Sequence, residues 1–190
     1  MRRYESPAAL RMALGHHLRS DSQESGISIE RLRRRVMYER IVVRLDLAEP
    51  GMWVVKGGLA LDVRLGRRAR ASIDLDLGLR EDAIDGDRLR DRMIEALETD
   101  PDEDWFTFFV GRAEQLQADQ GGRAIWRYSV RSDLAGRQFG SLKLDVAPRV
   151  EELEPTERVP LHNELVFAGV RSRTAELIDI NRHAAEKLQP

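Results

Sequence analysis

The stretch ASIDLDLGL, residues 71–79, alternates apolar and polar residues in a strict period of two. Successive side chains of a β-strand point to opposite faces, so the alternation predicts a strand with one apolar and one polar face. The apolar face consists of Ile73, Leu75 and Leu77. Asp74 and Asp76 share the polar face with Ser72 and lie about 7 Å apart along it. Because two such carboxylates repel each other, water, an arginine or a cation has to compensate their charge.

Two glycines precede this strand, at the end of the apolar stretch MWVVKGG, residues 52–58. The following residues, 59–66, fit either a helix or a strand, and the glycines favour the order strand, turn, helix. Glycine lets backbone N–H groups approach a phosphate closely, and a helix that starts there turns its positive end toward the anion. A tight turn without a ligand is the alternative explanation of Gly57 and Gly58. The spacing matches neither a P-loop nor a dinucleotide-binding fingerprint.

The rest of the chain predicts an α+β domain with a mixed central sheet and N-terminal helices packed against it. Apolar periodicity predicts helices over residues 6–20, 28–48 and 85–98 and strands over residues 105–112, 124–131 and 139–147, with a turn-rich connection at 132–138. Residues 155–170 fit a loop with short extended pieces, and residues 178–190 the beginning of a helix. We interpret the run Arg33 to Arg35 as a solvated helix face, with a polyanion contact as the alternative.

Composition excludes several classes of protein. The formal net charge of -2 gives no overall electrostatic basis for binding nucleic acid or a membrane, so any polyanion site must be a local patch. The absence of cysteine excludes disulfides and thiolate sites, and the chain has neither a signal peptide nor a membrane span, which favours the cytoplasm. The four histidines lack metal-ligand spacing, and G-x-S-x-G is absent, so zinc and serine hydrolases are excluded.

The carboxylate pair is suited to a divalent metal. Mg²⁺ prefers oxygen ligands and is commonly held by one or two carboxylates together with substrate phosphates. Asp74 and Asp76 on a rigid strand are therefore a candidate anchor for catalytic metal ions in phosphoryl or nucleotidyl transfer. Exposed carboxylates without a catalytic role are the alternative.

The glycines and aspartates together resemble a known motif. The segment KGGLALDVRLG…ARASIDLDL resembles the opening motif of the nucleotidyltransferase superfamily, h-G-G or h-G-S followed by D-h-D or D-h-E. More narrowly, Trp53–Gly58 and Arg70–Asp76 resemble the W-h-L-K-G-G and R-x-S/T-x-D-h-D segments of the AbiEii/AbiGii toxin family, which includes the MenT proteins. The segments ERIVVRL, LAGRQFGSLKLDVA, LVFAGV and RHAAEKL look like further family landmarks in the expected order. The resemblance covers about residues 30–188.

This resemblance implies a nucleotidyltransferase fold and metal-dependent transfer of a nucleotide from an NTP to an acceptor hydroxyl, with tRNA 3′ ends the acceptor for the MenT members. It implies that Gly57 and Gly58 hold the triphosphate and that Asp74 and Asp76 bind Mg²⁺ or Mn²⁺. Ser72 would contact phosphate or metal-bound water, or merely form a local hydrogen bond. The remaining nucleotide-binding candidates are Lys56 and Arg70. Lys187 in AEKL matches the family's lysine and is a catalytic candidate that would neutralise triphosphate charge, with a surface lysine of the terminal helix as the alternative.

Asp145 is the candidate third carboxylate. It alternates with Leu144 and Val146 in LKLDVA, so it emerges from a strand face opposite an apolar one. It would ligate the metal or activate the attacking hydroxyl, with a surface or salt-bridge role as the alternative. Arg64, Arg67 and Arg68, like Arg70, could bind phosphates or belong to a solvated loop.

Family members continue beyond A-E-K-L-H-A into a segment resembling S-R-x-K-D-h-x-D-L. The sequence of this chain ends at Gln189-Pro190. We therefore expect residues 1–190 to form a single nucleotidyltransferase-like domain without this C-terminal helical segment, with two explanations open: a fragment of a longer protein, or a protein that lacks this half of the site and is inactive alone.

Taken together, the sequence predicts a metal-dependent nucleotidyltransferase that is the toxin of a toxin–antitoxin or phage-defence (abortive infection) system. The expected partners are an NTP, an RNA acceptor such as tRNA, and a cognate antitoxin of the helix-turn-helix AbiEi-like kind, with no membrane. Two alternatives stay open. One is an inactive remnant that binds nucleotide, RNA or the antitoxin, and the other is a small-molecule nucleotidyltransferase of the antibiotic-modifying type.

Overall fold

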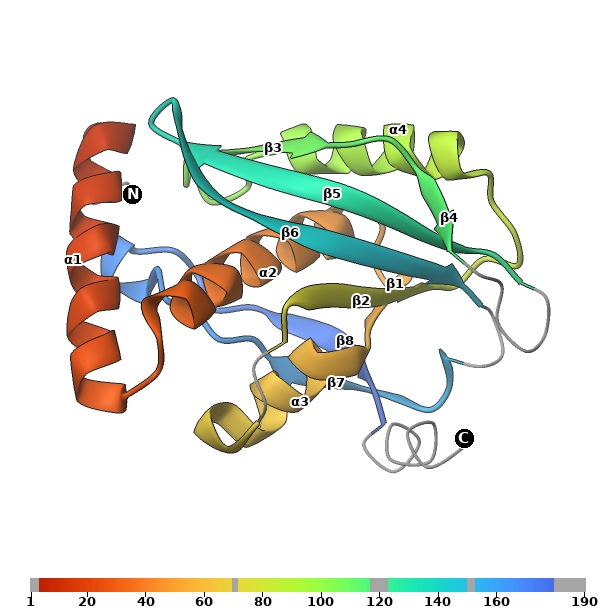
Figure 1. The fold of residues 1–190 in the computed structure, drawn as a ribbon, viewed down its shortest axis with the longest axis horizontal. Coiled ribbons are helices and arrows are strands. Elements are labelled where there is room, and N and C mark those ends of the chain that lie inside the picture. Colours follow the sequence, from red (N-terminus) through yellow and green to blue (C-terminus); the bar gives the residue numbers. More distant parts are fainter. Residues whose placement is uncertain (1–3, 70–71, 117–122, 150–152, 180–190) are drawn as a thin grey trace.

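The computed structural model describes residues 4–69, 72–116, 123–149 and 153–179. In these residues the fold is α+β, as predicted, with a mixed eight-stranded sheet in the order β3-β5-β6-β2-β1-β8-β7, and β4 paired with β5 (Figure 1). The helices are α1 (Pro7–Ser25), α2 (Ile29–Ala48), α3 (Gly57–Leu65) and α4 (Gly86–Glu98). The strands are β1 (Trp53–Val55), β2 (Asp74–Leu79), β3 (Phe106–Val110), β4 (Glu114–Leu116), β5 (Ile125–Leu134), β6 (Arg137–Pro148), β7 (Thr156–Pro160) and β8 (Thr174–Ile178).

The centre of the sheet is formed by β5, β6 and β2. β5 and β6 are an antiparallel hairpin, whereas β2 runs parallel to β6 and antiparallel to β1. The hairpin turns at Ala135 and Gly136, which both have positive φ, 55° and 66°. A two-residue turn of this hand matches the twist of the flanking strands. The strands therefore extend through most of residues 132–138, and the expected longer connection there is wrong.

One face of the sheet packs on α2 and α4. Leu75 and Leu77 of β2 point to this side and are fully buried, together with Leu144 of β6. Gly140 allows close packing of α2, since a Cβ at this position would lie 2.7 Å from the Met37 sulfur. The beginning of α4 is held by the Tyr128 hydroxyl, which donates a hydrogen bond of 2.8 Å to the Gly86 carbonyl.

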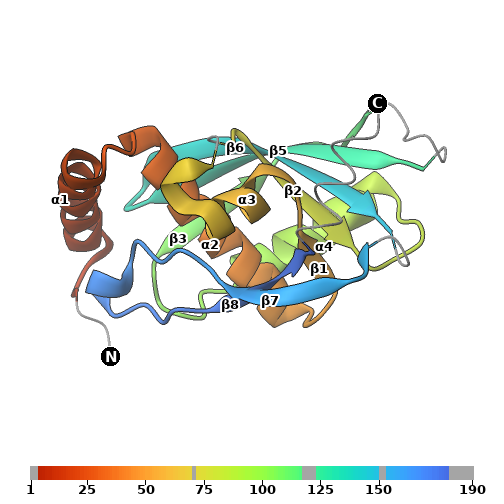
Figure 2. The same ribbon diagram turned by 90° about the horizontal axis from the view of Figure 1, so that it is seen from below.

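α1 stands at one end of the sheet, beside the β5–β6 turn (Figure 2). It begins at the predicted Ser6 cap and Pro7, but it continues through residues 21–25, which were expected to be a loop, and ends at Gly26 with φ 73°. Its buried residues Leu10, Leu14 and Leu18 belong to a second apolar cluster with residues of α2, β3 and β5.

Other differences from the sequence prediction follow from tertiary contacts. Ile73 is 69% exposed because β2 begins only at Asp74. Arg35 is buried and forms an ion pair with Asp62, so the solvated-face interpretation is wrong for this residue, although Arg33 is exposed. The strands β4 and β8 were not predicted, because they are short, with three and five residues.

α2 is buried over most of its length, and its buried charged residues are paired. Arg40 and Arg44 are fully buried and share the carboxylate of Asp104, with closest distances of 3.0 and 2.7 Å. Ion pairing and hydrogen bonds compensate the loss of hydration of buried charges. No helix among the described residues has the length and apolar character required to cross a membrane.

Candidate active site

The face of the sheet away from α2 and α4 carries the predicted acidic residues. Asp74 and Asp76 lie on the same face of β2, opposite the buried Leu75 and Leu77. Parallel pairing of β2 with β6 places Asp76 directly beside Asp145. Three carboxylates from two adjacent strands are thus gathered at the centre of the sheet.

The two glycines contact this acidic face directly. α3 begins at Gly57, which has φ 58°, and a Cβ at this position would lie 1.7 Å from Oδ2 of Asp76. A Cβ on Gly58 would lie 2.5 Å from both Cβ and Oγ of Ser72. Both positions therefore require glycine, because the start of α3 is packed against Asp76 and Ser72.

Backbone groups at this junction are directed at Asp76. The Gly58 N–H donates a hydrogen bond to the Asp76 carboxylate, and the Lys56 N–H donates one of 2.9 Å to the Asp76 carbonyl. The first amides of a helix favour an anion. In the structure this anion is a carboxylate of the protein, and the Lys56 side chain adds positive charge near it.

Ser72 is held by local hydrogen bonds. Its hydroxyl donates to the Asp74 carbonyl at 2.8 Å, and the Tyr38 hydroxyl of α2 donates to the Ser72 carbonyl at 3.2 Å. Burial raises the pKa of Tyr38, and the charges of Asp74 and Asp76 raise it further. Tyr38 therefore stays a neutral hydrogen-bond donor beside the acidic face.

The ionised form of Asp76 is disfavoured. Burial raises the pKa of Asp76 to about 6, and the neighbouring charges of Asp145 and Asp74 act in the same direction. Lys56 and the Gly58 N–H oppose this shift. A partly buried carboxylate that is close to two others is the arrangement that a bound cation would stabilise most.

Arg127 of β5 also belongs to this site, and sequence reasoning missed it. Its Nε and Nη2 donate to the two carboxylate oxygens of Asp145 at 2.7 and 2.6 Å, and Nη2 lies 3.5 Å from Asp74. These hydrogen bonds raise the pKa of Arg127. Alternation around Trp126 and Tyr128 would have placed Arg127 on the polar face. Only the register of β5 with β6 brings it to Asp145.

The donor set is chemically suited to Mg²⁺ or Mn²⁺, since it consists of carboxylate oxygens on rigid strands. However, within residues 4–69, 72–116, 123–149 and 153–179 no group of three or more His, Cys, Asp or Glu side chains is arranged to hold a metal ion. Arg127 occupies both oxygens of Asp145, which leaves Asp74 and Asp76 as the carboxylates available to a cation.

Among the other predicted phosphate-binding residues, Arg64 is engaged away from the acidic face. Arg64 belongs to α3 and pairs with Glu157 at 2.5 Å, also donating to the Ile178 carbonyl. Arg70 and Lys187 lie outside the described residues.

Comparison with known families of proteins gives a match over most of the chain. A family model described as "Nucleotidyl transferase AbiEii toxin, Type IV TA system" matches residues 40–189. A search of curated proteins found no match. Among solved structures, the chain is similar to that of a proposed nucleotidyltransferase from H. pylori, with a TM-score of 0.46 and 19% identity over 85% of this chain. The match covers 59% of the H. pylori chain, so the present chain corresponds to about three fifths of its length.

Proposed function

Because the chain belongs to the AbiEii family of nucleotidyl transferase toxins of type IV toxin–antitoxin systems, we propose that it transfers a nucleotide from an NTP to an acceptor hydroxyl. The observation that carries this proposal is the set of three carboxylates, Asp74, Asp76 and Asp145, on neighbouring strands next to the start of α3. We further propose that the acceptor is RNA, with tRNA the first candidate, and that the partner in the cell is a cognate antitoxin.

In the proposed reaction the acceptor oxygen bonds to the α-phosphorus of the NTP, the bond to pyrophosphate breaks, and the hydroxyl proton passes to a base. Asp74 and Asp76 would hold Mg²⁺ or Mn²⁺, which supplies charge neutralisation at the phosphates when bound. The chain's own cations, Lys56 beside Asp76 and Arg127 beside Asp145, would bind the phosphate oxygens.

Ser72 and Tyr38 would act on the geometry of the site rather than on the substrate. Their side chains are engaged with backbone carbonyls, of Asp74 and of Ser72 respectively. These hydrogen bonds hold the beginning of β2 against α2, and they keep both aspartates on the open face.

Labelled transfer tests the proposal. The purified protein is incubated with each α-labelled NTP, Mg²⁺ or Mn²⁺, and total tRNA, and label on RNA is measured. We expect transfer by the wild type and a loss of at least 100-fold in Asp74→Asn and Asp76→Asn, because each carboxylate contributes to charge stabilisation in the transition state. Asp91→Asn is the control, since Asp91 has a 79% exposed side chain on α4 and is remote from the acidic face.

One observation favours a second candidate, a nucleotide-binding domain without transfer activity. Arg127 already neutralises Asp145 through a bidentate ion pair. If Asp145 remains paired when NTP binds, only Asp76 and Asp74, the latter 3.5 Å from Arg127, would be left to hold a cation. NTP binding by equilibrium dialysis without any labelled product would support this candidate. Undiminished transfer by both aspartate variants would contradict the main one.

A further inference from the structure

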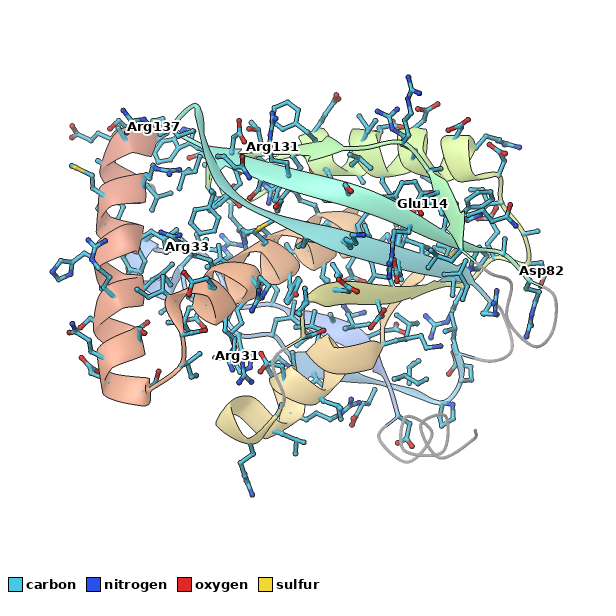
Figure 3. All side chains as sticks on the ribbon, in the orientation of Figure 1. Arg31, Arg33, Asp82, Glu114, Arg131 and Arg137 are labelled. Atoms are coloured by element: carbon cyan, nitrogen blue, oxygen red, sulfur yellow. The ribbon has the colours of Figure 1, made fainter. Side chains whose placement is uncertain are left out.

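A groove of about 720 Å³ lies between α1, the beginning of α2 and the β5–β6 turn. Four arginines line it, together with His16 and Phe139: Arg11, Arg19, Arg33 and Arg137. Figure 3 labels Arg33 and Arg137, which come from α2 and from the first residue of β6. No aspartate or glutamate is among the described residues that line the groove. In a chain with a net charge of -2, this is a local concentration of positive charge.

The charges of this groove are not neutralised by the described part of the protein. Arg11 donates to the carbonyls of Leu134, Arg137 and Gln138 at 3.0 to 3.1 Å, which are neutral acceptors. Arg19, Arg33 and Arg137 are exposed and form no ion pair with any carboxylate in the described part of the chain. By contrast, Arg131, near the same turn, is paired with Asp133 at 3.2 Å. The groove therefore presents free guanidinium groups to solvent.

Further cations connect the groove with the acidic face. Arg34 follows Arg33 on α2, and the charges of Arg34, Asp74 and Asp76 all act on the Tyr38 hydroxyl. Nε of Arg34 is buried and lacks a hydrogen-bond partner among the described residues.

The sheet provides a second connection. Lys143 is exposed on β6, opposite Asp74 and two residues before Asp145, and thus on the same face. From Arg137 to Asp145 β6 spans eight residues, or about 26 Å at the rise of a strand.

We propose that this groove binds the phosphate backbone of an RNA and directs one end of it along β6 toward the acidic face. Guanidinium groups form bidentate hydrogen bonds with phosphate oxygens. Contacts of this kind position a nucleic acid without reading its sequence. The inference rests on the proposed function in one respect, that the acceptor is RNA. It adds the surface that binds the acceptor, at a distance from the reacting atoms.

Binding of a fluorescein-labelled 20-nucleotide RNA, measured by anisotropy at several salt concentrations, tests this inference. The test variant is Arg33→Gln/Arg137→Gln, because both side chains are exposed and neither is in an ion pair with a described residue. Each lost phosphate contact lowers the slope of log K against log salt by about 0.7, so the loss of two contacts lowers it by about 1.4. If the two proteins bind equally at 1 M salt, the affinity of the variant at 0.1 M salt is therefore about 25-fold below that of the wild type. Arg33→Lys/Arg137→Lys, which keeps both charges, should retain most of the binding.

The control is Arg88→Gln/Arg112→Gln, with the same change of net charge. Arg88 of α4 and Arg112 after β3 are exposed, outside the groove, and without an ion pair to any described carboxylate. This variant should bind the RNA within about twofold of the wild type. Equal losses in the two double variants would overturn the inference, because binding would then depend on net charge alone.

Two further measurements separate this inference from the proposed function. Asp74→Asn/Asp76→Asn should lose transfer but still bind the RNA, and the groove variant should raise KM for RNA with little change in kcat. RNA binding that depends on the groove in a protein without transfer activity would support the groove and contradict the proposed function. A poly-glutamate peptide with the same charge as the RNA serves as a competitor class. If this peptide binds as tightly as the RNA, and if the groove variant loses both kinds of binding equally, the assignment to nucleic acid is overturned.

Discussion

Asp76 is the residue on which most of the site converges. Its carboxylate receives the Gly58 N–H, it would clash with any side chain at Gly57, and it lies beside Asp145 on the next strand. Burial and two neighbouring carboxylates raise its pKa to about 6. Partly buried carboxylates with raised pKa values are typical of functional sites. Such groups lower the stability of the folded protein below what other side chains at the same positions would give.

The raised pKa of Asp76 predicts a pH dependence of stability. In the unfolded chain an aspartate titrates near pH 4, so between about pH 4 and pH 6 the folded protein binds a proton that the unfolded chain has lost. The free energy of unfolding therefore falls as pH rises through this window. Without metal, at pH 7.5, we expect Asp76→Asn to be more stable than wild type by about 2 kcal/mol, and by much less at pH 4.

Urea unfolding in EDTA at both pH values measures this difference. Asp91→Asn, which alters an exposed carboxylate, should show no comparable dependence. A stability difference between Asp76→Asn and wild type that is the same at pH 4 and pH 7.5 would refute the assignment of the shift to Asp76.

The junction between β1 and α3 positions this part of the site. β1 ends at Val55, and α3 begins two residues later at Gly57, with positive φ and no side-chain cap. This tight connection brings the first amides of α3 onto the acidic face of β2. A helix of only nine residues is thus placed by its N-terminal contact with one carboxylate.

Substitution of Gly57 and of Gly66, the glycines at the two ends of α3, distinguishes the cost of backbone strain from the cost of a steric collision. Gly57 and Gly66 have nearly the same φ, 58° and 55°, but a Cβ on Gly66 has no atom within 4 Å. Gly66→Ala should therefore lower the free energy of unfolding by about 1–2 kcal/mol, from strain alone. We expect Gly57→Ala to be clearly more destabilising, because its Cβ collides with Asp76, and to weaken NTP binding.

Thermal unfolding and equilibrium dialysis with an NTP check both variants. Gly66→Ala should bind the NTP as the wild type does, since Gly66 lies at the far end of α3 from the acidic face. Equal destabilisation by the two substitutions would show that the close approach of Gly57 to Asp76 is not present in solution.

Across the whole molecule, the apolar residues divide into two clusters. The larger one lies between the sheet and helices α2 and α4, and the smaller one attaches α1 to the end of the sheet. Phe108 and Phe139 pack against both clusters. The basic groove lies where α1 meets the β5–β6 turn, so its shape depends on the smaller cluster.

Leu14→Ala tests this division. Leu14 is completely buried in the smaller cluster, and its truncation should lower the free energy of unfolding by about 3 kcal/mol. In hydrogen exchange we expect α1 amides to lose protection, with β2 and β6 amides less affected. Met12→Ala, on the same helix but 73% exposed, is the matched control and should change neither quantity appreciably. Uniform loss of protection in α1, β2 and β6 would mean that the two clusters unfold as one unit.

The amino-acid sequence by itself determined the elements with regular periodicity and the pairing of glycines with aspartates. The positions of α1, α2 and α4 and the acidic strand follow from apolar spacing and alternation, which depend only on local geometry. The candidate site residues Gly57, Gly58, Asp74 and Asp76 could be selected from the sequence for the same reason, and because their order resembles a family motif.

Only the tertiary structure decided what lies beside these residues. Strand order and register are set by packing between segments far apart in the chain, so neither the pairing of Asp76 with Asp145 nor that of Arg127 with Asp145 can be read from local spacing. The same holds for the burial of Arg35 against Asp62 and for the short strand β8. Charges on one strand face or helix acquire their partners only when the sheet assembles, and it is this assembly that turns a polar strand into a candidate active site.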